Sequence, residues 1–289
     1  MHTQVAVIGG TGFYQMDGLA DLEEITLDTP FGSPSDSIVI GTLSGRRVAF
    51  LARHGRGHRF SPSQINVRAN IYALKQLGVE WVLSVSAVGS LRPEIRPRDF
   101  VIPDQLYDHT KTRQNTFFDG GLVAHVGLAE PFCPTLRELL YTGAVQAGVT
   151  VHRGGTYLCM EGPQFSTKAE SNVYRTLGFS VIGMTVAPEA KLAREAEMCY
   201  ASIACSTDYD CWHPEHETVT VEMIFQNLLA NVGLAKRVIQ TVIPALPAER
   251  TCGCGTALAK AIVTHRAAIA DETIKRLGPI VGKYLQCST

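Results

Sequence analysis

An acidic pair follows one of the apolar runs of this sequence. Asp208 and Asp210 come shortly after residues 200–205, which are all apolar or small. Burial in a partly dry site disfavours a charged carboxylate, so Asp208 could hold a proton near neutral pH and donate it to a leaving group. Because an aspartate behind a threonine could also be a helix cap, both roles stay open at this stage.

Three segments that follow apolar runs combine glycine, hydroxyl or basic side chains. They are residues 9–12 with Thr11, residues 53–58 with Arg53 and His54, and residues 84–90 with Ser86 and Ala87. Backbone N–H groups in tight turns, hydroxyls and guanidinium forks all donate hydrogen bonds to tetrahedral anions. The three segments together predict one phosphate pocket, whereas alone the first could be a plain turn and the second a solvated loop.

A further group of residues is suited to a flat heterocycle. Phe165, in the run Met-Glu-Gly-Pro-Gln-Phe-Ser of residues 160–166, could stack on an aromatic ring, and Met184 offers a soft wall for a sugar. Both lie near apolar runs, as Asp208 does. We therefore expect a nucleoside-like ligand beside the predicted phosphate pocket.

Side chains that could bind a metal gather at two places in the sequence. Ligand-type side chains crowd residues 208–216, but the spacing Cys-x-His-x-x-His of Cys211, His213 and His216 is not a recognised zinc arrangement. Cys252 and Cys254, separated by one glycine, could form a strained disulfide or bind a soft metal. Plain burial of reduced thiols is the preferred interpretation of the eight cysteines, so no metal is predicted.

The elements that must position these residues alternate along the chain. Apolar runs at residues 5–8, 47–52, 81–88, 180–184 and 200–205 predict buried strands, and helical periodicity marks residues 64–77, 134–146, 167–177, 188–197 and 221–243. The alternation predicts an α/β fold with a central mixed β-sheet flanked by helices. Ligands of such folds bind at the ends of strands.

No linker interrupts the chain, which predicts a single domain over residues 1–289. Within it, residues 1–243 are expected to form the core and residues 244–289 a C-terminal helical extension. Two amphipathic helices, at residues 256–270 and 271–285, are predicted in that extension.

Composition limits the class of protein. The chain has 289 residues, 45% hydrophobic and 18% charged, with a net charge of -1. A nucleic-acid partner would need a basic surface, and no apolar run approaches membrane-spanning length. With no secretion signal recognised at its start, the chain is expected to be cytoplasmic.

Several blocks, in order, resemble the trimeric purine nucleoside phosphorylase family, in particular its methylthioadenosine branch. They are residues 8–12, 51–56, 130–134, 161–166 and 207–212. The resemblance implies a pentosyltransferase that cleaves 5′-methylthioadenosine with inorganic phosphate as co-substrate and without a cofactor, in purine and methionine salvage. It also implies a homotrimer, in some relatives doubled to a hexamer.

The resemblance also assigns residues to the parts of the site. Thr11, Arg53, His54, Ser86, Ala87 and Thr185 would bind phosphate; Phe165, Met184, Thr207, Asp208 and Asp210 would bind purine and ribose; and Val221, Ile224 and Phe225, with His125 of a neighbouring subunit, would surround the methylthio group. Asp208 would be the catalytic acid, at purine N7. Ser86 replaces a threonine of the family and keeps the hydroxyl.

Two positions indicate which purine the site accepts. Family members that act on guanosine and inosine carry Glu and Asn where this chain has Ser166 and Asp208. The alternatives are a 6-oxopurine or methylthioinosine phosphorylase, a purine-binding protein without activity, and a dinucleotide-dependent dehydrogenase. The last is opposed by Gln15, which stands where a dinucleotide fingerprint has its third glycine.

Overall fold

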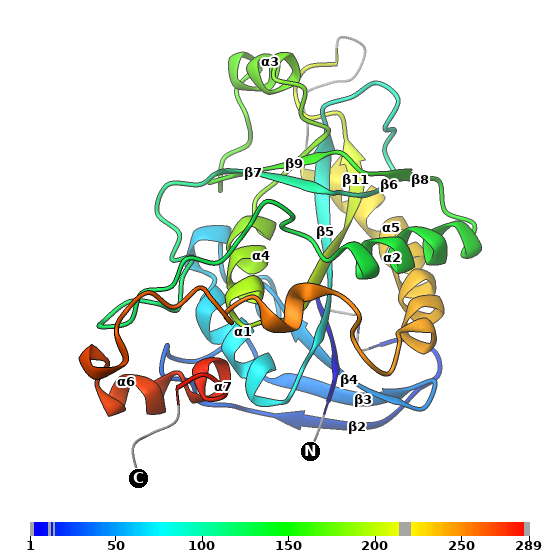
Figure 1. The fold of residues 1–289 in the computed structure, drawn as a ribbon. Coiled ribbons are helices and arrows are strands. Elements are labelled where there is room, and N and C mark those ends of the chain that lie inside the picture. Colours follow the sequence, from blue (N-terminus) through cyan, green and yellow to red (C-terminus); the bar gives the residue numbers. More distant parts are fainter. Residues whose placement is uncertain (1–2, 11–12, 14, 214–220, 286–289) are drawn as a thin grey trace.

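The computed structural model describes residues 3–10, 13, 15–213 and 221–285, with only the backbone for residues 221–225 (Figure 1). These residues form one mixed sheet of eleven strands with helices on its faces. The α/β fold predicted from the alternating apolar runs is therefore confirmed. The division into a core of residues 1–243 and an extension stays a prediction.

Strand β5 is the centre of the sheet. It pairs in parallel with β1 on one side and with β11 on the other, and its last residues pair with β10. From β2 to β7 the path runs β2-β3-β4-β1-β5-β10-β9-β7, and β11 leads from β5 to β6 and then β8. The bounds are β1 Val5–Gly9, β2 Leu19–Ile25, β3 Ile38–Leu43, β4 Arg46–Ala52, β5 Trp81–Ser90, β6 Phe100–Ile102, β7 Gln105–His109, β8 Val151–Arg153, β9 Thr156–Met160, β10 Val181–Gly183 and β11 Cys199–Asp208.

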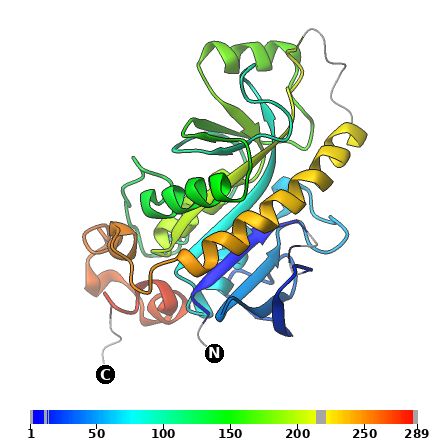
Figure 2. The same ribbon diagram turned by 90° about the vertical axis from the view of Figure 1, so that its right-hand side faces the viewer.

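Helices cover both faces of this sheet. The α-helices are α1 Val67–Gln76, α2 Pro134–Gln146, α3 Lys168–Thr176, α4 Val186–Glu195, α5 Val221–Ala245, α6 Asp271–Arg276 and α7 Gly278–Val281. Helices α1 and α4 lie on one face, and α2 and the long α5 on the other (Figures 1 and 2). The strands supply both cores by alternation: Ala6 and Ile8 of β1 belong to the first, and Val5 and Val7 to the second.

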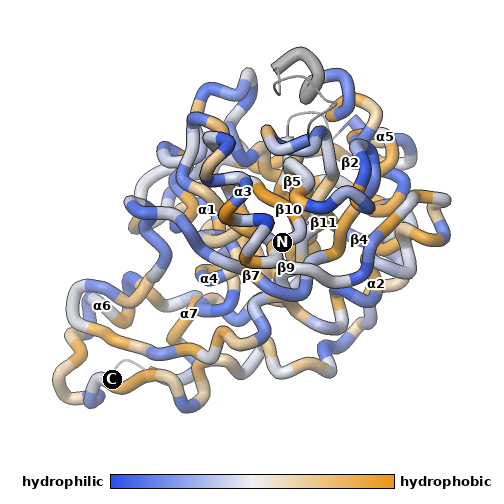
Figure 3. Tube along the Cα trace, turned by 90° about the horizontal axis from the view of Figure 1, so that it is seen from above, coloured by the Kyte–Doolittle hydropathy of each residue, from blue (hydrophilic) through white to orange (hydrophobic). Residues whose placement is uncertain are grey.

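Seen from above, hydrophobic stretches gather around the central strands, and hydrophilic stretches follow the outer loops (Figure 3). Within the described ranges, no helix combines the length and the apolar character needed to cross a lipid bilayer.

The predicted helices of the tail are largely wrong. Residues 256–270 form turns and the short 3₁₀ helix Arg266–Ala268, and of residues 271–285 only α6 and α7 are helical. Tertiary pairing overrides the local helix propensity, because Ile262 forms a β-bridge with Ala124 and the Val263 amide donates to the Val123 carbonyl. The six strands β2, β3, β6, β7, β8 and β9 were not predicted either. Five of them are short or partly exposed, whereas β3 is an apolar run that sequence reasoning missed.

Candidate active site

The carboxyl ends of the parallel strands β1, β4, β5 and β11 lie at the same edge of the sheet. Arg53 follows β4, and its amide donates to the Gly9 carbonyl at the end of β1 at 2.9 Å. Asp208 is the last residue of β11 and is in register with Gly89 of β5. Segments far apart in the sequence therefore converge on one edge, as the sequence predicted.

The Arg53 guanidinium is buried in an ion pair with Glu189 of helix α4. Its Nε donates to Glu189 Oε1 at 2.5 Å and its Nη2 to Oε2 at 3.1 Å, with 3% and 2% of the side chains exposed. Nη1 donates to the Val85 carbonyl at 2.7 Å, and Nη2 also donates to Ser84 Oγ at 2.7 Å. The side chain is a rigid positive group at the strand ends, so the solvated-loop interpretation is wrong for Arg53.

His54 is neutral in this environment. Burial lowers its pKa to about 4, and the positive charge of Arg53 acts in the same direction. Nδ1 lies 2.8 Å from the Phe60 carbonyl, which can only accept, so Nδ1 carries the proton. The Nε2 atom is then a hydrogen-bond acceptor, while the ring stacks on His58 at 4.0 Å between centroids.

Strand β5 opens toward solvent at Ala87, which is exposed between the buried residues Ser86 and Val88. Thr185, only 7% exposed, is the N-cap of helix α4, and its side chain makes no capping hydrogen bond. Its hydroxyl is thus available at a positive helix terminus, where anions bind favourably. Ser86 and Thr185 supply hydroxyls of the type that the phosphate prediction requires.

A β-bulge sets the direction of the Asp208 side chain. The register of β11 against β5 shifts between Ser206, opposite Val88, and Asp208, opposite Gly89. Gly89 is required there, since a Cβ atom at this position would lie 2.9 Å from Asp208 Oδ1. The carboxyl group is therefore packed closely against the backbone of β5.

Burial raises the pKa of Asp208 to about 6, and the neighbouring Asp210 charge adds to the rise. Hydrogen bonds partly oppose this effect: Thr207 Oγ1 donates to Oδ2 at 2.7 Å and the Asp210 amide to Oδ1 at 2.8 Å. Burial also raises the pKa of Asp210. The helix-cap interpretation of Asp208 is wrong, because this residue ends a strand and no helix begins at it.

The predicted purine and ribose residues lie on neighbouring loops. Phe165 is 48% exposed, unusually open for its size, and the Cys211 thiol donates to the Ser166 carbonyl at 3.2 Å. Gly162 has φ +65°, and a Cβ atom there would come within 2.5 Å of Met184 Sδ. The loop of residues 160–166 is thus held against both the Asp210 end of the site and Met184.

Glu161 anchors this loop. Although partial burial would raise it, the pKa of Glu161 is held well below its usual range by hydrogen bonds from the Lys111 amide and the Ser63 hydroxyl. Arg113 Nε also donates to its Oε1 at 3.0 Å. A carboxylate so stabilised is a poor proton donor, which leaves Asp208 and Asp210 as the acidic groups with raised pKa values at these strand ends.

The two parts of the site are arranged along β5. Arg53 contacts Val85, and Asp208 packs on Gly89, four residues further on. At the rise of an extended strand this separates them by about 13 Å, with the exposed Ala87 between them. A donor-rich end and an acidic end therefore face one open stretch of strand.

Some predicted site residues are not placed with the others. Thr11 lies outside the described residues, as do the side chains of Val221, Ile224 and Phe225. His125 is exposed, and its amide donates to the Ala261 carbonyl at 2.9 Å in the tail. The nearby Leu258 amide contacts Glu197, just before β11 begins, so His125 is near the opposite end of that strand from Asp208.

Supporting residues that sequence reasoning missed are Glu189, Asn227 and Asn231. Asn227 Nδ2 donates to the Thr207 carbonyl at 2.7 Å and Asn231 Nδ2 to the Ser206 carbonyl at 2.9 Å. Helix α5 thereby fixes the bulge that orients Asp208. An amide repeated at i and i+4 of a helix was the available signal, because such residues share one face.

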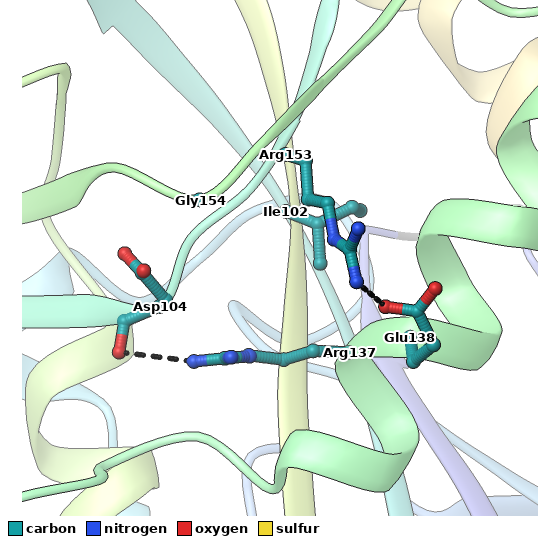
Figure 4. A pocket seen from close by; sticks show the side chains of 6 residues that line it. All are labelled: Ile102, Asp104, Arg137, Glu138, Arg153 and Gly154. Carbon is teal, nitrogen blue, oxygen red and sulfur yellow. Dashed lines mark hydrogen bonds and ion pairs between the residues drawn. The ribbon is translucent and has the colours of Figure 1, made fainter.

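A hollow of about 270 Å³ lies elsewhere, between α2 and the loops after β6 and β8 (Figure 4). Arg153 pairs with Glu138 at 2.5 Å, and Arg137 Nη1 donates to the Asp104 carbonyl at 3.4 Å. The cations that line this hollow are engaged by protein oxygens. It shares no lining residue with the strand-end site.

Comparison with known proteins identifies close relatives. A sequence profile of the Phosphorylase superfamily matches residues 4–244. The chain is 56% identical to the S-methyl-5′-thioadenosine phosphorylase of Koribacter versatilis, over 98% of this chain and 97% of that protein. It is also 56% identical to the protein of that name from Geobacter sulfurreducens, over 99% of this chain and 100% of the relative.

Solved structures agree with the sequence relatives. A crystal structure of methylthioadenosine phosphorylase from an antarctic soil metagenomic library superimposes with a TM-score of 0.93, at 48% identity, over 96% of this chain and 99% of that one. An adenosine/methylthioadenosine phosphorylase mutant from Schistosoma mansoni, in complex with adenine, gives a TM-score of 0.82 at 36% identity, over 86% of this chain and 93% of that one.

The buried ion pair leads to a stability prediction. Replacing Glu189 with Gln leaves the Arg53 guanidinium without its counter-charge, and breaking a buried pair in this way costs about 3–5 kcal/mol. We expect a loss of this size in the free energy of unfolding, measured by urea denaturation. The control is Glu138→Gln in the exposed pair with Arg153, which should cost less than about 1 kcal/mol. Equal losses in the two variants would contradict the role given to Glu189.

Proposed function

Because the chain belongs to the phosphorylase superfamily, we propose that it cleaves the N-glycosidic bond of 5′-methylthioadenosine with inorganic phosphate. The products are adenine and 5-methylthioribose-1-phosphate. The observation that carries the proposal is the buried Asp208 carboxyl, with its pKa raised to about 6, on the same strand edge as a fixed set of anion donors. The dinucleotide-dependent dehydrogenase alternative is wrong, since the chain is a phosphorylase relative over nearly its whole length.

The choice of substrate within the superfamily rests on Ser166 and Asp208. A glutamate in place of Ser166 would accept from N1–H of a 6-oxopurine, and an asparagine in place of Asp208 could donate to O6. A serine and an acid suit adenine better, with Asp210 at the 6-amino group. The relatives named for methylthioadenosine support the same choice.

Phosphate is bound at the donor-rich end. The Thr185 hydroxyl and the N-terminus of α4 donate directly to the anion. The charge of Arg53 is balanced by Glu189, so we propose that Arg53 contributes N–H donors and a fixed geometry at the end of β4. Ser86 and the Ala87 segment add further donors, as does Thr11. Neutral His54 presents Nε2 as an acceptor, which complements the P–OH group of monohydrogen phosphate.

The reaction is a displacement at C1′ of the ribose. As the glycosidic bond breaks, positive charge develops on the sugar, and the bound phosphate stabilises it and attacks C1′. The electron pair of the bond moves to the purine, and Asp208 donates its proton to N7, so adenine leaves as a neutral molecule. Phe165 stacks on the base and Met184 packs on the ribose, which holds C1′ between the two ends.

The assembly is proposed to be a homotrimer, which two copies could double to a hexamer. In it, His125 completes a neighbour's methylthio pocket beside Val221, Ile224 and Phe225. Support comes from an apolar strip next to His125. Val123 and Val263, joined by a 3.0 Å hydrogen bond, are 45% and 60% exposed in the isolated chain. Burial of such a strip against a second copy is favourable.

A cytoplasmic location is also proposed. The seven cysteines within the described ranges are all free thiols, and free thiols persist in reducing compartments.

The reaction as written needs no organic cofactor. Adenine release then places the enzyme in purine salvage and the sugar phosphate in methionine salvage.

The function is tested by adenine release from 5′-methylthioadenosine with and without phosphate. We expect release only with phosphate, together with 5-methylthioribose-1-phosphate, and slower turnover of inosine assayed side by side. Faster phosphorolysis of inosine would favour a 6-oxopurine enzyme. If the protein binds adenine but does not release it from 5′-methylthioadenosine when phosphate is added, it would instead be a non-catalytic purine-binding protein.

The acid role of Asp208 predicts a pH profile. The protonated carboxyl is the active form, so kcat/KM for the nucleoside, at saturating phosphate, should fall as pH rises through about 6. Asp208→Asn should lose at least 10²-fold in kcat and lack this ionisation. Near-normal turnover by the variant, or an unchanged fall in kcat/KM as pH rises through about 6, would remove Asp208 from the acid role.

The phosphate assignment predicts a selective change in KM. Thr185→Ala removes one hydrogen bond to an anion, worth about 1.5–3 kcal/mol, and should raise the KM for phosphate about 10- to 100-fold with little change for the nucleoside. Thr185→Ser should restore most of the affinity. Thr241→Ala, on the exposed side of α5, is the control and should have no effect. Equal rises in both KM values would contradict the assignment.

A further inference from the structure

Four cysteine thiols meet at one point inside the molecule. Cys133, Cys199, Cys252 and Cys254 place their Sγ atoms all within 4.8 Å of one another. The Sγ of Cys252 lies 3.7 Å from that of Cys133 and 3.3 Å from that of Cys199. Four sulfurs from three separate parts of the chain therefore form one compact cluster, which we call the thiol cluster.

The spacing of the thiol cluster matches a tetrahedral metal site. A zinc ion bound by four thiolates has Zn–S distances of about 2.3 Å, which sets the sulfurs about 3.8 Å apart. A disulfide would require about 2.05 Å between two sulfurs, and all four cysteines are free. The sulfur–sulfur distances of 3.7 and 3.3 Å are near the spacing of a tetrathiolate site and far from that of a disulfide.

The surroundings of the cluster complement a negative charge. Four thiolates on a divalent cation carry a net charge of −2, and Arg194 Nη1 donates to Cys254 Sγ at 3.6 Å. Its Nη2 donates to the Glu130 carbonyl, and its buried Nε has no hydrogen-bond acceptor among the described residues. Cys133 is the residue before helix α2, whose N-terminus also favours a thiolate.

The burial of the thiol cluster indicates a structural metal site and not a catalytic one. Cys133, Cys199 and Cys254 are at most 2% exposed, whereas Cys252 is partly exposed and offers a route of entry. Four protein ligands leave no open coordination position for a substrate or water. Cys199 and Asp208 are nine residues apart on β11, about 30 Å at the rise of a strand, so the thiol cluster is separate from the proposed active site.

We propose that Cys133, Cys199, Cys252 and Cys254 bind one thiophilic divalent cation of the zinc class, which fastens the C-terminal tail to the sheet. Each thiol releases its proton to solvent as it binds. The tail residues Cys252 and Cys254 are thereby tied to the first residue of β11 and to the start of α2. This replaces the prediction from sequence that the chain holds no metal.

The same region is already a point of attachment for the tail. Buried Glu197 accepts from the Leu258 amide at 2.9 Å and from the Tyr284 hydroxyl at 2.7 Å, and it pairs with Lys283. Arg250 Nη1 donates to the Glu197 carbonyl at 2.7 Å. A metal ion beside these contacts would add its binding free energy to the folding of the tail.

The test measures metal directly in the full-length protein, purified from zinc-supplemented cells under reducing conditions. We expect about one zinc per chain by elemental analysis. Cobalt added anaerobically to the stripped protein should give the thiolate charge-transfer band and the intense visible bands of a tetrahedral tetrathiolate site. Cys252→Ala should lose both signals, while Cys205→Ala, which removes a buried cysteine outside the cluster, should keep them.

Thermal unfolding supplies the second readout. Removing zinc from the wild-type protein under reducing conditions should lower its unfolding temperature, and the temperature of Cys252→Ala should not respond to zinc. Should Cys252→Ala fail to fold, the cobalt titration of the wild type still decides. Absence of zinc and of the cobalt bands in the wild type, disulfides within the cluster in freshly prepared protein, or full zinc content in Cys252→Ala would each overturn the proposal.

Discussion

The buried pair of Arg53 and Glu189 is the interaction on which the active-site edge depends. Arg53 comes from the end of β4 and Glu189 from the first turn of α4, while Tyr200 of β11 donates to Glu189 Oε2 at 2.7 Å and Ser84 of β5 donates to the same oxygen at 3.2 Å. Four elements are thus joined through one carboxylate. Because isolated charges are so costly to bury, this pair is stable only when every partner is in place, and that requirement fixes the strand ends relative to α4.

The site combines two opposite electrostatic environments along one strand. At the Val85 end, the N-terminus of α4 and the hydroxyls of Ser86 and Thr185 are hydrogen-bond donors for the proposed anion, and the paired Arg53 and Glu189 hold them in place. At the Gly89 end, burial keeps a carboxyl group close to its protonated form, so it can give up a proton to a departing base. The short distance along β5 between these environments would allow one nucleoside to contact both in the proposed reaction. Neither environment would perform the reaction alone.

How much of this the sequence revealed depends on the range of the interactions involved. The strands that end at Arg53, Ala87 and Asp208 are continuous apolar runs, so their positions and the edge they share could be predicted locally. The partner of Arg53 could not, since Glu189 is 136 residues away and carries no local signal. The helix prediction for the tail was wrong for the same reason. Helix propensity is a local property, whereas the pairing of the tail with residues 123–125 is not. Likewise, Cys252 and Cys254 are close together in the sequence and stand out as a pair, whereas their proximity to Cys133 and Cys199 depends on the fold.

Strand β11 runs from the thiol cluster to the proposed active site, and the two sites differ in how accessible they are. Its first residue, Cys199, lies in the largely buried thiol cluster, whose four cysteines could fill all four ligand positions of a metal ion. Its last residue, Asp208, lies in an open site where a bulge and the amides of α5 set the direction of the side chain. A closed site can contribute only to stability, and an open one can exchange ligands. A cation at the closed end would hold the tail against the sheet and, through the Ala124–Ile262 bridge, the segment that carries His125. Stability at this end of β11 would in this way support the proposed subunit contact, through which His125 completes the site of a neighbouring copy.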